Sequence, residues 1–147
     1  MINEQNLPLF LISFGIVSVT ILILLIIYGI KQKKKKKELL MDPNNVEIKF
    51  DCSIIKSQKV NINPPQTCYI LHDISDEECQ IFGNSLITNK EHLKLDIEHF
   101  QLRYNTNFAA SMGREKVTID IEKGKKYYVS YNYMGKCHEI KQREKKN

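Results

Sequence analysis

The sequence predicts a mainly β protein, in which a single N-terminal transmembrane α-helix is followed by a small antiparallel β-sandwich. Three observations support this prediction. Residues 7–30 form a stretch of 24 residues without a charged side chain. Six lysines follow directly, between Lys31 and Lys37. From Val46 onward, apolar and polar residues alternate with the period of two that is typical of half-buried strands.

The uncharged stretch, residues 7–30, is long enough to cross a bilayer. At about 1.5 Å per residue, a helix of this length extends roughly 36 Å, and a hydrocarbon core is about 30 Å thick. A cleaved signal peptide would begin with a basic region and have a shorter apolar core, whereas only Glu4 is charged ahead of this stretch. A helix buried in a globular core is the other alternative, but the remaining residues are too few to cover it on all sides. We therefore expect a permanent membrane span.

The lysine run predicts the orientation of this span. Lysine and arginine within about 15–20 residues of a span tend to stay on the cytoplasmic side, and here they lie only on its carboxyl-terminal side. We expect residues 1–6 to face outward and residues 31–147 to face the cytosol, or the matrix or stroma in an organelle. Anionic lipid attracts such runs. The candidate headgroup contacts are Lys31, Lys33, Lys34, Lys35, Lys36 and Lys37.

The positive net charge does not indicate a nucleic-acid-binding protein. The formal net charge is +5, but residues 42–140 hold 12 basic and 14 acidic residues. A nucleic-acid-binding domain usually carries a basic face of its own, whereas here the basic excess belongs to the lysine run and to a tail, residues 141–147. We expect the membrane bilayer and one or more proteins as partners, and no nucleic acid.

The strands of the β domain are expected to begin after a turn at residues 42–45. Alternation predicts strands in VEIKFDC, HLKLDI, EKVTIDI and KKYYVSYNY, and TCYILH is a further run that predicts a strand. The segments CQIF and SLIT flank Gly83-Asn84, a pair typical of a two-residue hairpin. The apolar positions change phase at Glu98-His99, which predicts a tight turn or a bulge there.

These features divide the chain into five parts. Six to eight short strands in about 95 residues are typical of an antiparallel sandwich or a small barrel. The expected parts are a non-cytosolic terminus (1–6), the transmembrane helix (7–30), a polybasic juxtamembrane linker (31–45), the β-sandwich domain (46–140) and a basic tail (141–147).

Residues 79–133 resemble the small β-sandwich modules of the PEGA type and related lipoprotein-like domains. Those modules have a short strand, a Gly/Asn turn, a second strand, a further strand that begins at a histidine and a late G-K-x-Y-Y. Residues 99–102 (HFQL) and 124–128 (GKKYY) occupy the last two places, whereas the usual Pro-Gly before the histidine is replaced by Ile97-Glu98. The resemblance covers about half of the soluble part. It implies a structural or binding module at a membrane or envelope, without catalysis, and it assigns no functional residue.

The cysteines are expected to be thiols in the domain core. The cytosolic side of a membrane is reducing, and free cysteine is among the most buried residue types. If the topology were reversed, two disulfides would be expected instead. Cys68, His72, Cys137 and His138 also suggest a zinc site, but adjacent residues of a strand point to opposite faces, so the last two are not expected to share one metal. The four cysteines are Cys52, Cys68, Cys79 and Cys137.

Two further groups of side chains have both a functional and a structural interpretation. An acidic cluster lacks the alternating oxygens and the glycine of an EF-hand loop, so a solvated loop is favoured over a Ca²⁺ site or a contact with a basic partner. A group of tyrosines is suited to stacking on bases, but core packing is favoured because the domain is nearly neutral. The groups are Asp73, Asp76, Glu77 and Glu78, and Tyr127, Tyr128, Tyr131 and Tyr133.

The chain contains none of the local signatures G-x-S-x-G, G-x-x-x-x-G-K-[ST] or H-E-x-x-H. Catalytic sets that assemble only in space leave no such signature. We expect no catalytic residue, metal or cofactor. The leading hypothesis is a membrane-anchored, non-catalytic interaction module, such as an accessory subunit of a larger membrane complex. The alternatives are a membrane-surface sensor that binds anionic lipid, and an enzyme of unknown class.

Overall fold

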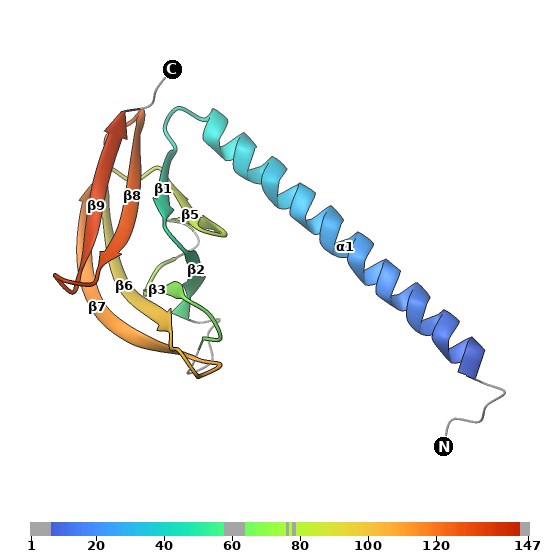
Figure 1. Cartoon of the computed structure of the whole chain (residues 1–147). Coiled ribbons are helices and arrows are strands. Elements are labelled where there is room, and N and C mark those ends of the chain that lie inside the picture. Colours follow the sequence, from blue (N-terminus) through green and yellow to red (C-terminus); the bar gives the residue numbers. More distant parts are fainter. Residues whose placement is uncertain (1–6, 58–63, 76, 78, 145–147) are drawn as a thin grey trace. The chain divides into compact units, whose positions relative to one another are not determined.

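One helix and nine strands make up the described part of the chain (Figure 1). The contacts within the chain separate it into two compact units, Met1–Glu38 and Leu39–Asn147, and all nine strands belong to the second unit. The computed structural model describes residues 7–57, 64–75, 77 and 79–144, and the side chains of these residues from position 12 to position 142.

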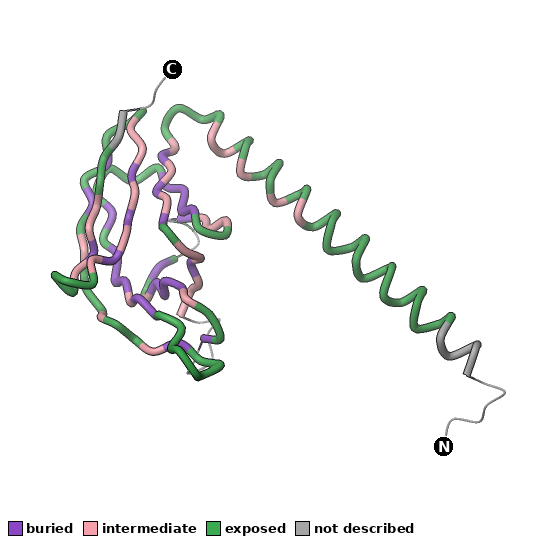
Figure 2. The backbone as a smooth tube through the Cα atoms, viewed as in Figure 1, coloured by how far each residue is buried: buried purple, intermediate pink, exposed green. Residues whose placement is uncertain are grey.

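Helix α1 spans Leu7–Met41 and runs without a break through the lysines. Within the described residues it is the one helix that is long and apolar enough to cross a membrane. Apart from Gly29, every residue from Ile12 to Ile30 is exposed, on all sides of the helix axis (Figure 2). The expected linker, residues 31–45, is therefore helical up to Met41, because lysine, glutamate, leucine and methionine are good helix formers.

The helix ends at a combination of backbone and side-chain signals. Pro43 lacks an N–H group and cannot extend the helical ladder. The side-chain amide of Asn45 donates to the carbonyl oxygen of Leu39 at 2.8 Å, which satisfies one of the carbonyl groups that every helix leaves open at its end. The first strand begins at the next residue, Val46.

The strands form two mixed sheets. The first has the order β4-β5-β1-β8-β9 and the second has the order β2-β3-β6-β7. The strands are β1 (Val46–Phe50), β2 (Ser53–Lys56), β3 (Cys68–His72), β4 (Gln80–Phe82), β5 (Ser85–Thr88), β6 (His92–Leu102), β7 (Ala109–Asp120), β8 (Lys125–Asn132) and β9 (Cys137–Glu144).

The sheets differ from the antiparallel arrangement that the sequence predicts. Strand β1 pairs with β8 in parallel, and β2 pairs with β3 in parallel, whereas all other pairs are antiparallel. Parallel neighbours need a connection of about a dozen residues, and residues 57–67 provide it between β2 and β3. Alternation along one strand carries no information on the direction of its neighbour, so the sequence pattern could not reveal these pairs.

Both sheets contribute side chains to one buried core, which we call the main core. On β1 and β8, buried residues alternate with less buried ones, as predicted. A smaller cluster, the outer cluster, is formed by Cys68, Ile70, Phe100 and Ala109. Members of the main core include Val46, Ile48, Phe50, Tyr69, Leu71, Leu86, Leu93, Leu95, Ile97, Tyr127, Val129 and Tyr131.

Strand β6 explains the change of phase in the sequence. It is one continuous strand, and its pairing with β7 shifts register between His99 and Phe100, where Met112 on β7 has no partner. The predicted irregularity is therefore a bulge, and the extra residue is on the neighbouring strand. Because the odd-numbered residues of β6 face the main core, Phe100 faces the opposite side and joins the outer cluster.

The last strand extends past the expected end of the β domain. Strand β9 pairs with β8 from Cys137 to Glu144, so the first four residues of the expected basic tail, 141–144, belong to the sheet. The remaining residues of that tail and the expected non-cytosolic terminus, residues 1–6, lie outside the described residues.

Candidate functional site

The six lysines that follow the apolar stretch form a collar around one helix. We call Lys31 and Lys33–Lys37 the lysine collar. Successive residues of an α-helix are about 100° apart and rise about 1.5 Å each, so six lysines in seven positions surround the axis over roughly 10 Å. The ammonium group of Lys34 lies 4.0 Å from the carboxylate of Glu38, and both side chains are largely exposed. The collar is therefore a ring of solvated positive charge, and not a stripe on one face.

The apolar part of α1 differs from that of a helix that lies along a membrane surface. Such a helix has one apolar face and one charged face. Between Ile12 and Ile30 no side chain is charged, and polar groups are turned back onto the helix: the hydroxyls of Ser18 and Thr20 donate to the carbonyl oxygens of Phe14 and Ile16 at 2.9 and 2.8 Å. Bonds of this kind satisfy hydroxyl groups where water is absent.

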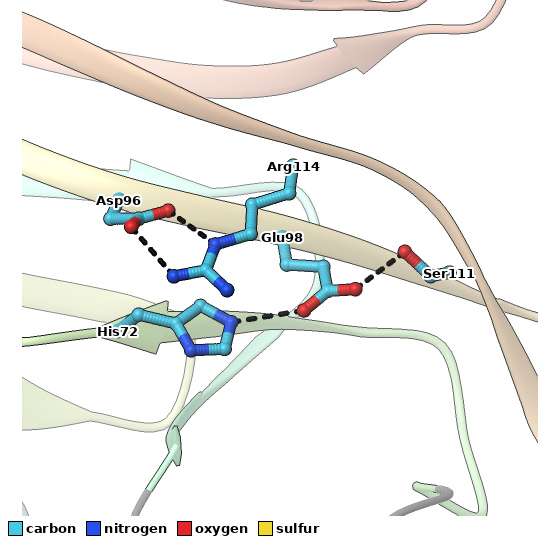
Figure 3. Close-up of polar contacts among 5 residues, drawn as sticks. All are labelled: His72, Asp96, Glu98, Ser111 and Arg114. Carbon is cyan, nitrogen blue, oxygen red and sulfur yellow. Dashed lines mark hydrogen bonds and ion pairs between the residues drawn. The ribbon is translucent and has the colours of Figure 1, made fainter.

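A second candidate site is a polar network on three strands of the second sheet (Figure 3). We call it the Glu98 network: His72 on β3, Asp96 and Glu98 on β6, and Ser111 and Arg114 on β7. One oxygen of the Glu98 carboxylate accepts from the Ser111 hydroxyl at 2.6 Å, and the other lies 2.9 Å from Nε2 of His72. Beside it, the Arg114 guanidinium donates two hydrogen bonds of 2.8 Å to Asp96.

The order of groups in this network matters for its chemistry. In serine acyl transfer a histidine stands between the serine and the carboxylate and takes the serine proton. Here the carboxylate of Glu98 stands between Ser111 and His72, so the histidine has no contact with the hydroxyl. The arrangement links β3, β6 and β7 through side chains, and the Arg114 hydrogen bonds hold the pKa of Asp96 below its usual value.

A third group of titratable side chains lies in and around the main core. The ring of His99 is 2% exposed, stacks on Tyr131 at 4.8 Å and lies 3.0 Å, through Nε2, from the Tyr133 hydroxyl. Burial lowers the pKa of His99, and its Nδ1 atom has no hydrogen-bond partner among the described residues. Nearby, burial raises the pKa of Tyr69. The lowered pKa of His99 favours its uncharged form inside a core that is rich in tyrosine.

A carboxylate connects the edges of the two sheets. Glu115 on β7 accepts from the backbone N–H of His138 on β9 at 2.9 Å and lies 3.1 Å from Nδ1 of the same residue. The backbone N–H contact is the main reason why the pKa of Glu115 is lowered. The bond occupies an amide on an edge strand, a group that would otherwise be open to pairing with another chain.

The structure separates the residues that suggested a zinc site. Cys68 and His72 are on β3, in one sheet, and Cys137 and His138 are on β9, in the other. In the described ranges, no three or more histidine, cysteine, aspartate or glutamate side chains are arranged to hold a metal ion. As expected for adjacent residues of a strand, His138 is buried whereas Cys137 is only half-buried.

None of the four cysteines forms a disulfide. Cys68 and Cys79 are buried, and Cys52 and Cys137 are half-buried. Burial, reinforced by the Asp51 carboxylate, raises the pKa of Cys52 to about 12, so this thiol is protonated at neutral pH. Because the thiolate is the reactive form, the environment of Cys52 favours a packing role, as the sequence predicted.

The acidic cluster and the tyrosines are placed as follows. Asp73 is exposed and has a positive φ of 53°, and Glu77 is also exposed, whereas Asp76 and Glu78 lie outside the described residues.

Tyr127 and Tyr131 are buried in the main core, Tyr128 is half-buried, and Tyr133 is 50% exposed. The predicted core packing is confirmed for Tyr127 and Tyr131.

Sequence reasoning did not find the Glu98 network. Its members are separated by up to 42 positions, and only the register of β3, β6 and β7 brings them together. One signal was available, since Lys94, Asp96 and Glu98 are the charged residues that alternate with the apolar face of β6. That pattern identifies a polar face, but it does not identify the partners on neighbouring strands.

The comparisons with known proteins do not place the chain in a family. No protein-family model matches the chain, and no curated protein or solved structure shows significant similarity to it. The resemblance of residues 79–133 to PEGA-type modules stays a prediction.

Proposed function

We propose that this protein is a single-pass membrane protein whose β domain is a non-catalytic interaction module on the cytosolic side. The observation that carries the proposal is the helix. Its residues 12–30 have no charged side chain, and apart from Gly29 all of them are exposed, while the lysine collar begins at the next residue. We infer that residues 7–30 cross the bilayer, that the collar lies at the cytosolic headgroups, and that the two mixed sheets are the layers of a sandwich.

The dimensions of α1 support a span that ends at the collar. Twenty-four residues extend roughly 36 Å and a collar of seven positions a further 10 Å or so. A hydrocarbon core is about 30 Å thick, and each headgroup region adds about 5–7 Å. The collar is therefore long enough to extend across the headgroup layer, and its ring form provides a lysine on every side of the helix.

The β domain supports a role in interaction more than in catalysis. Its polar contacts join one strand to another, and in the Glu98 network the order of groups differs from that of an acyl-transfer triad. An accessory subunit of a larger membrane complex is the form of this function that we propose.

Alkaline extraction tests the anchor. Full-length chain in membranes should stay in the pellet after washing at high pH, whereas release into the supernatant would overturn the proposed span.

Orientation is tested in sealed vesicles with a maleimide that does not cross membranes, after placing a cysteine at exposed Lys123 in a variant in which Cys52 and Cys137 are replaced by serine. Labelling from the cytosolic side alone is expected.

Native mass measurement after gentle extraction tests the interaction role. We expect a particle heavier than one 17.2 kDa chain plus bound detergent, with at least one other protein in it. A strictly monomeric particle without another protein would contradict the proposal even if the anchor is correct.

A second candidate function is sensing of anionic lipid by the collar. Near an anionic surface each lysine contributes about 1 kcal/mol, and the ring arrangement allows all six to reach headgroups. Replacing all six lysines with glutamine should weaken the enrichment of phosphatidylserine around the full chain in mixed-lipid nanodiscs. Enrichment that survives both this replacement and high salt would assign the lysines to topology alone.

A further inference from the structure

A cavity of about 360 Å³ lies at the place where the chain enters the β domain. Ligand-binding cavities in proteins usually measure roughly 300–1,000 Å³. Its walls come from the end of α1, the start of β1 and the turn that leads into β8, and all of them belong to the unit Leu39–Asn147. We call it the entry cavity. Its lining includes Leu40, Met41, Asp42, Glu47, Lys125 and Lys126.

The pairing of β1 with β8 explains why these residues meet. The two strands are parallel, with Ile48 opposite Tyr127, so both begin at the same end of the first sheet. Glu47 and Lys126 each come one position before this pair. Two segments that are far apart in the chain therefore bring carboxylates and ammonium groups to one cavity.

Both walls of the entry cavity are held by hydrogen bonds. On the helix side, the side-chain amide of Asn45 donates to the carbonyl oxygen of Leu39 at 2.8 Å. On the other side, the backbone N–H of Glu122 donates to the hydroxyl of Tyr127 at 2.8 Å, and Tyr127 is a member of the main core. A site that is held in place before binding loses little conformational freedom when a ligand enters.

The charged groups of the lining are two carboxylates and two ammonium groups, so their formal charges cancel. Asp42 is exposed, whereas both lysines are half-buried, which is uncommon for lysine. On β9, the residues paired with these lysines are Glu144 and Arg143, one of each sign. A complementary ligand therefore carries one anionic and one cationic group. The four groups of the lining belong to Asp42, Glu47, Lys125 and Lys126.

A phosphate ester with a primary ammonium group has this combination of charges. Lysine binds phosphate as a point charge, and an ammonium N–H donates a charge-assisted hydrogen bond to a carboxylate. A trimethylammonium group, as in a choline ester, has no N–H to donate. A serine ester carries an additional carboxylate, which would face Asp42 and Glu47. The primary ammonium ester is therefore the best match to the lining.

A second cavity shares Asp42 with the entry cavity but suits such a ligand less well. It measures about 190 Å³, and its lining comes from the end of α1, the approach to β4 and the end of β5. None of the described residues in this lining is basic. A phosphate would therefore meet carboxylates there without a counter-charge.

The entry cavity is close to the lysine collar along the chain. Leu40 follows Lys37, the last residue of the collar, by three positions. Because successive Cα atoms are 3.8 Å apart, at most about 11 Å separates the two residues. The proposed span puts the collar at the headgroups, so phospholipid is the nearest source of a phosphate ester. A soluble phosphate monoester is the other source.

We propose that the entry cavity binds a phosphate ester with a primary ammonium group, and that the headgroup of a phospholipid such as phosphatidylethanolamine supplies it. Lys125 and Lys126 contact the phosphate, and Asp42 and Glu47 accept from the ammonium group. The inference rests on the proposed membrane span and deepens it, because it names a lipid that is held at a defined site. The lysine collar, by contrast, attracts anionic lipid through its net charge.

Native mass spectrometry of the full chain tests the inference. The chain is placed in nanodiscs with equal amounts of phosphatidylethanolamine and phosphatidylcholine and is then released into mild detergent, and the retained lipids are counted. We expect one molecule of phosphatidylethanolamine per chain, in clear excess over phosphatidylcholine. Replacing the six lysines of the collar with glutamine should leave this retention unchanged, because the headgroup carries no net charge.

Variants of the lining make the test specific. Lys125→Gln/Lys126→Gln should lower the retention about tenfold or more, because charge-assisted hydrogen bonds to the phosphate are lost. Asp42→Asn should lower it as well, and it keeps an oxygen that accepts from the backbone N–H of Asn44, a contact of 2.9 Å. The matched variant Lys90→Gln/Lys94→Gln, which makes the same charge change at two exposed positions, should have no effect.

Free phosphoethanolamine, offered to the lipid-free chain in detergent, separates the two sources of the ester. Binding of the free ester without retention of the lipid would overturn the lipid as the source. Equal retention of phosphatidylcholine, or retention that survives Lys125→Gln/Lys126→Gln, would overturn the site itself. If the chain also leaves the membrane in alkali, the proposed span fails; if it stays, only the assignment of the entry cavity does.

Discussion

The helix and the β domain use the same apolar residue types in opposite ways. Leu24 in α1 is 61% exposed, whereas Leu86 in β5 is 0% exposed. Removing apolar surface from water is favourable by about 25 cal/mol per Å², and the domain achieves this with its own two sheets. The apolar side chains of α1 from Ile12 to Ile30 are exposed instead. The comparison teaches that the domain provides an apolar environment for its own side chains, and a bilayer is the environment that we propose for those of α1.

The difference between the two regions is tested most strongly by shortening a leucine to alanine in each of them. Leu86→Ala should lower the free energy of unfolding of the domain by about 2–5 kcal/mol, because it leaves a cavity in the main core. Leu24→Ala is the matched control and should leave that free energy unchanged. The measurement is urea unfolding of the full chain in detergent micelles, followed by tyrosine fluorescence, since the chain has no tryptophan. Equal effects of the two variants would contradict the comparison.

A charge in the helix tests the need for an apolar environment. Val19→Lys places an ammonium group near the middle of the proposed span, at a cost of about 3 kcal/mol for insertion, and should lower the fraction of chain that resists alkaline extraction. Ile30→Lys introduces the same charge next to the collar, where a lysine reaches the headgroups, and should have little effect. Equal losses for both variants would argue against a span that ends at Ile30.

Acid should weaken the domain through His99 while the helix is unaffected. The pKa of His99 is lowered by burial, so below about pH 6.5 the unfolded chain takes up a proton there that the folded domain does not. The free energy of unfolding should therefore fall as the pH drops through 6.5, down to the lowered folded-state pKa. Urea unfolding between pH 5 and pH 8 measures this dependence.

Two histidine variants separate the contribution of His99 from that of other titratable groups. The Asp51 carboxylate favours the protonated form of His99, and His138 disfavours it. His99→Gln should flatten the pH dependence, whereas His92→Gln should not, because the His92 side chain is 75% exposed. A slope that survives in His99→Gln would assign the effect to another group.

The smallest effect is expected on the outer face of the second sheet. Arg114→Ala removes two hydrogen bonds to Asp96, but the arginine side chain is 49% exposed, so we expect only a small loss of stability at pH 7. Since Arg114 lowers the pKa of Asp96, this contribution is present above the usual aspartate pKa and is lost as the pH falls through the lowered value. Urea unfolding at pH 7 and pH 3 should show a smaller difference between the variant and the unaltered chain at pH 3 than at pH 7. Asp120→Asn, which alters the exposed contact between His92 and Asp120, is the control with no expected change.

The elements that the sequence predicted correctly are those whose signal is local. The apolar helix follows from a run of uncharged residues, β1 and β8 from alternation, and the β4–β5 hairpin from Gly83-Asn84, where Gly83 has a positive φ of 62°. Each of these depends on residues that are close in the chain. The end of α1 was less predictable, because good helix formers carried the helix eleven residues beyond Ile30.

The pairing of distant strands was beyond the reach of the sequence pattern. Phe100 looked like the start of a new apolar set, but β6 is continuous, and the change of phase reflects a second buried cluster on the opposite face. Strand β9 was taken in part for a tail because its charged residues obscure the alternation. The parallel pairs β1–β8 and β2–β3 are set by long connections and shared burial, which no single strand reports.

The sequence by itself determined the apolar helix, its lysine collar and the nearly neutral charge of the domain, because charge and hydropathy are properties of short segments. Only the tertiary structure decided which side chains meet. Register placed Ser111, Glu98 and His72 in an order that differs from a catalytic triad. Topology placed Glu115 on β7 against His138 on β9, because strand pairing brings together residues that are far apart in the chain.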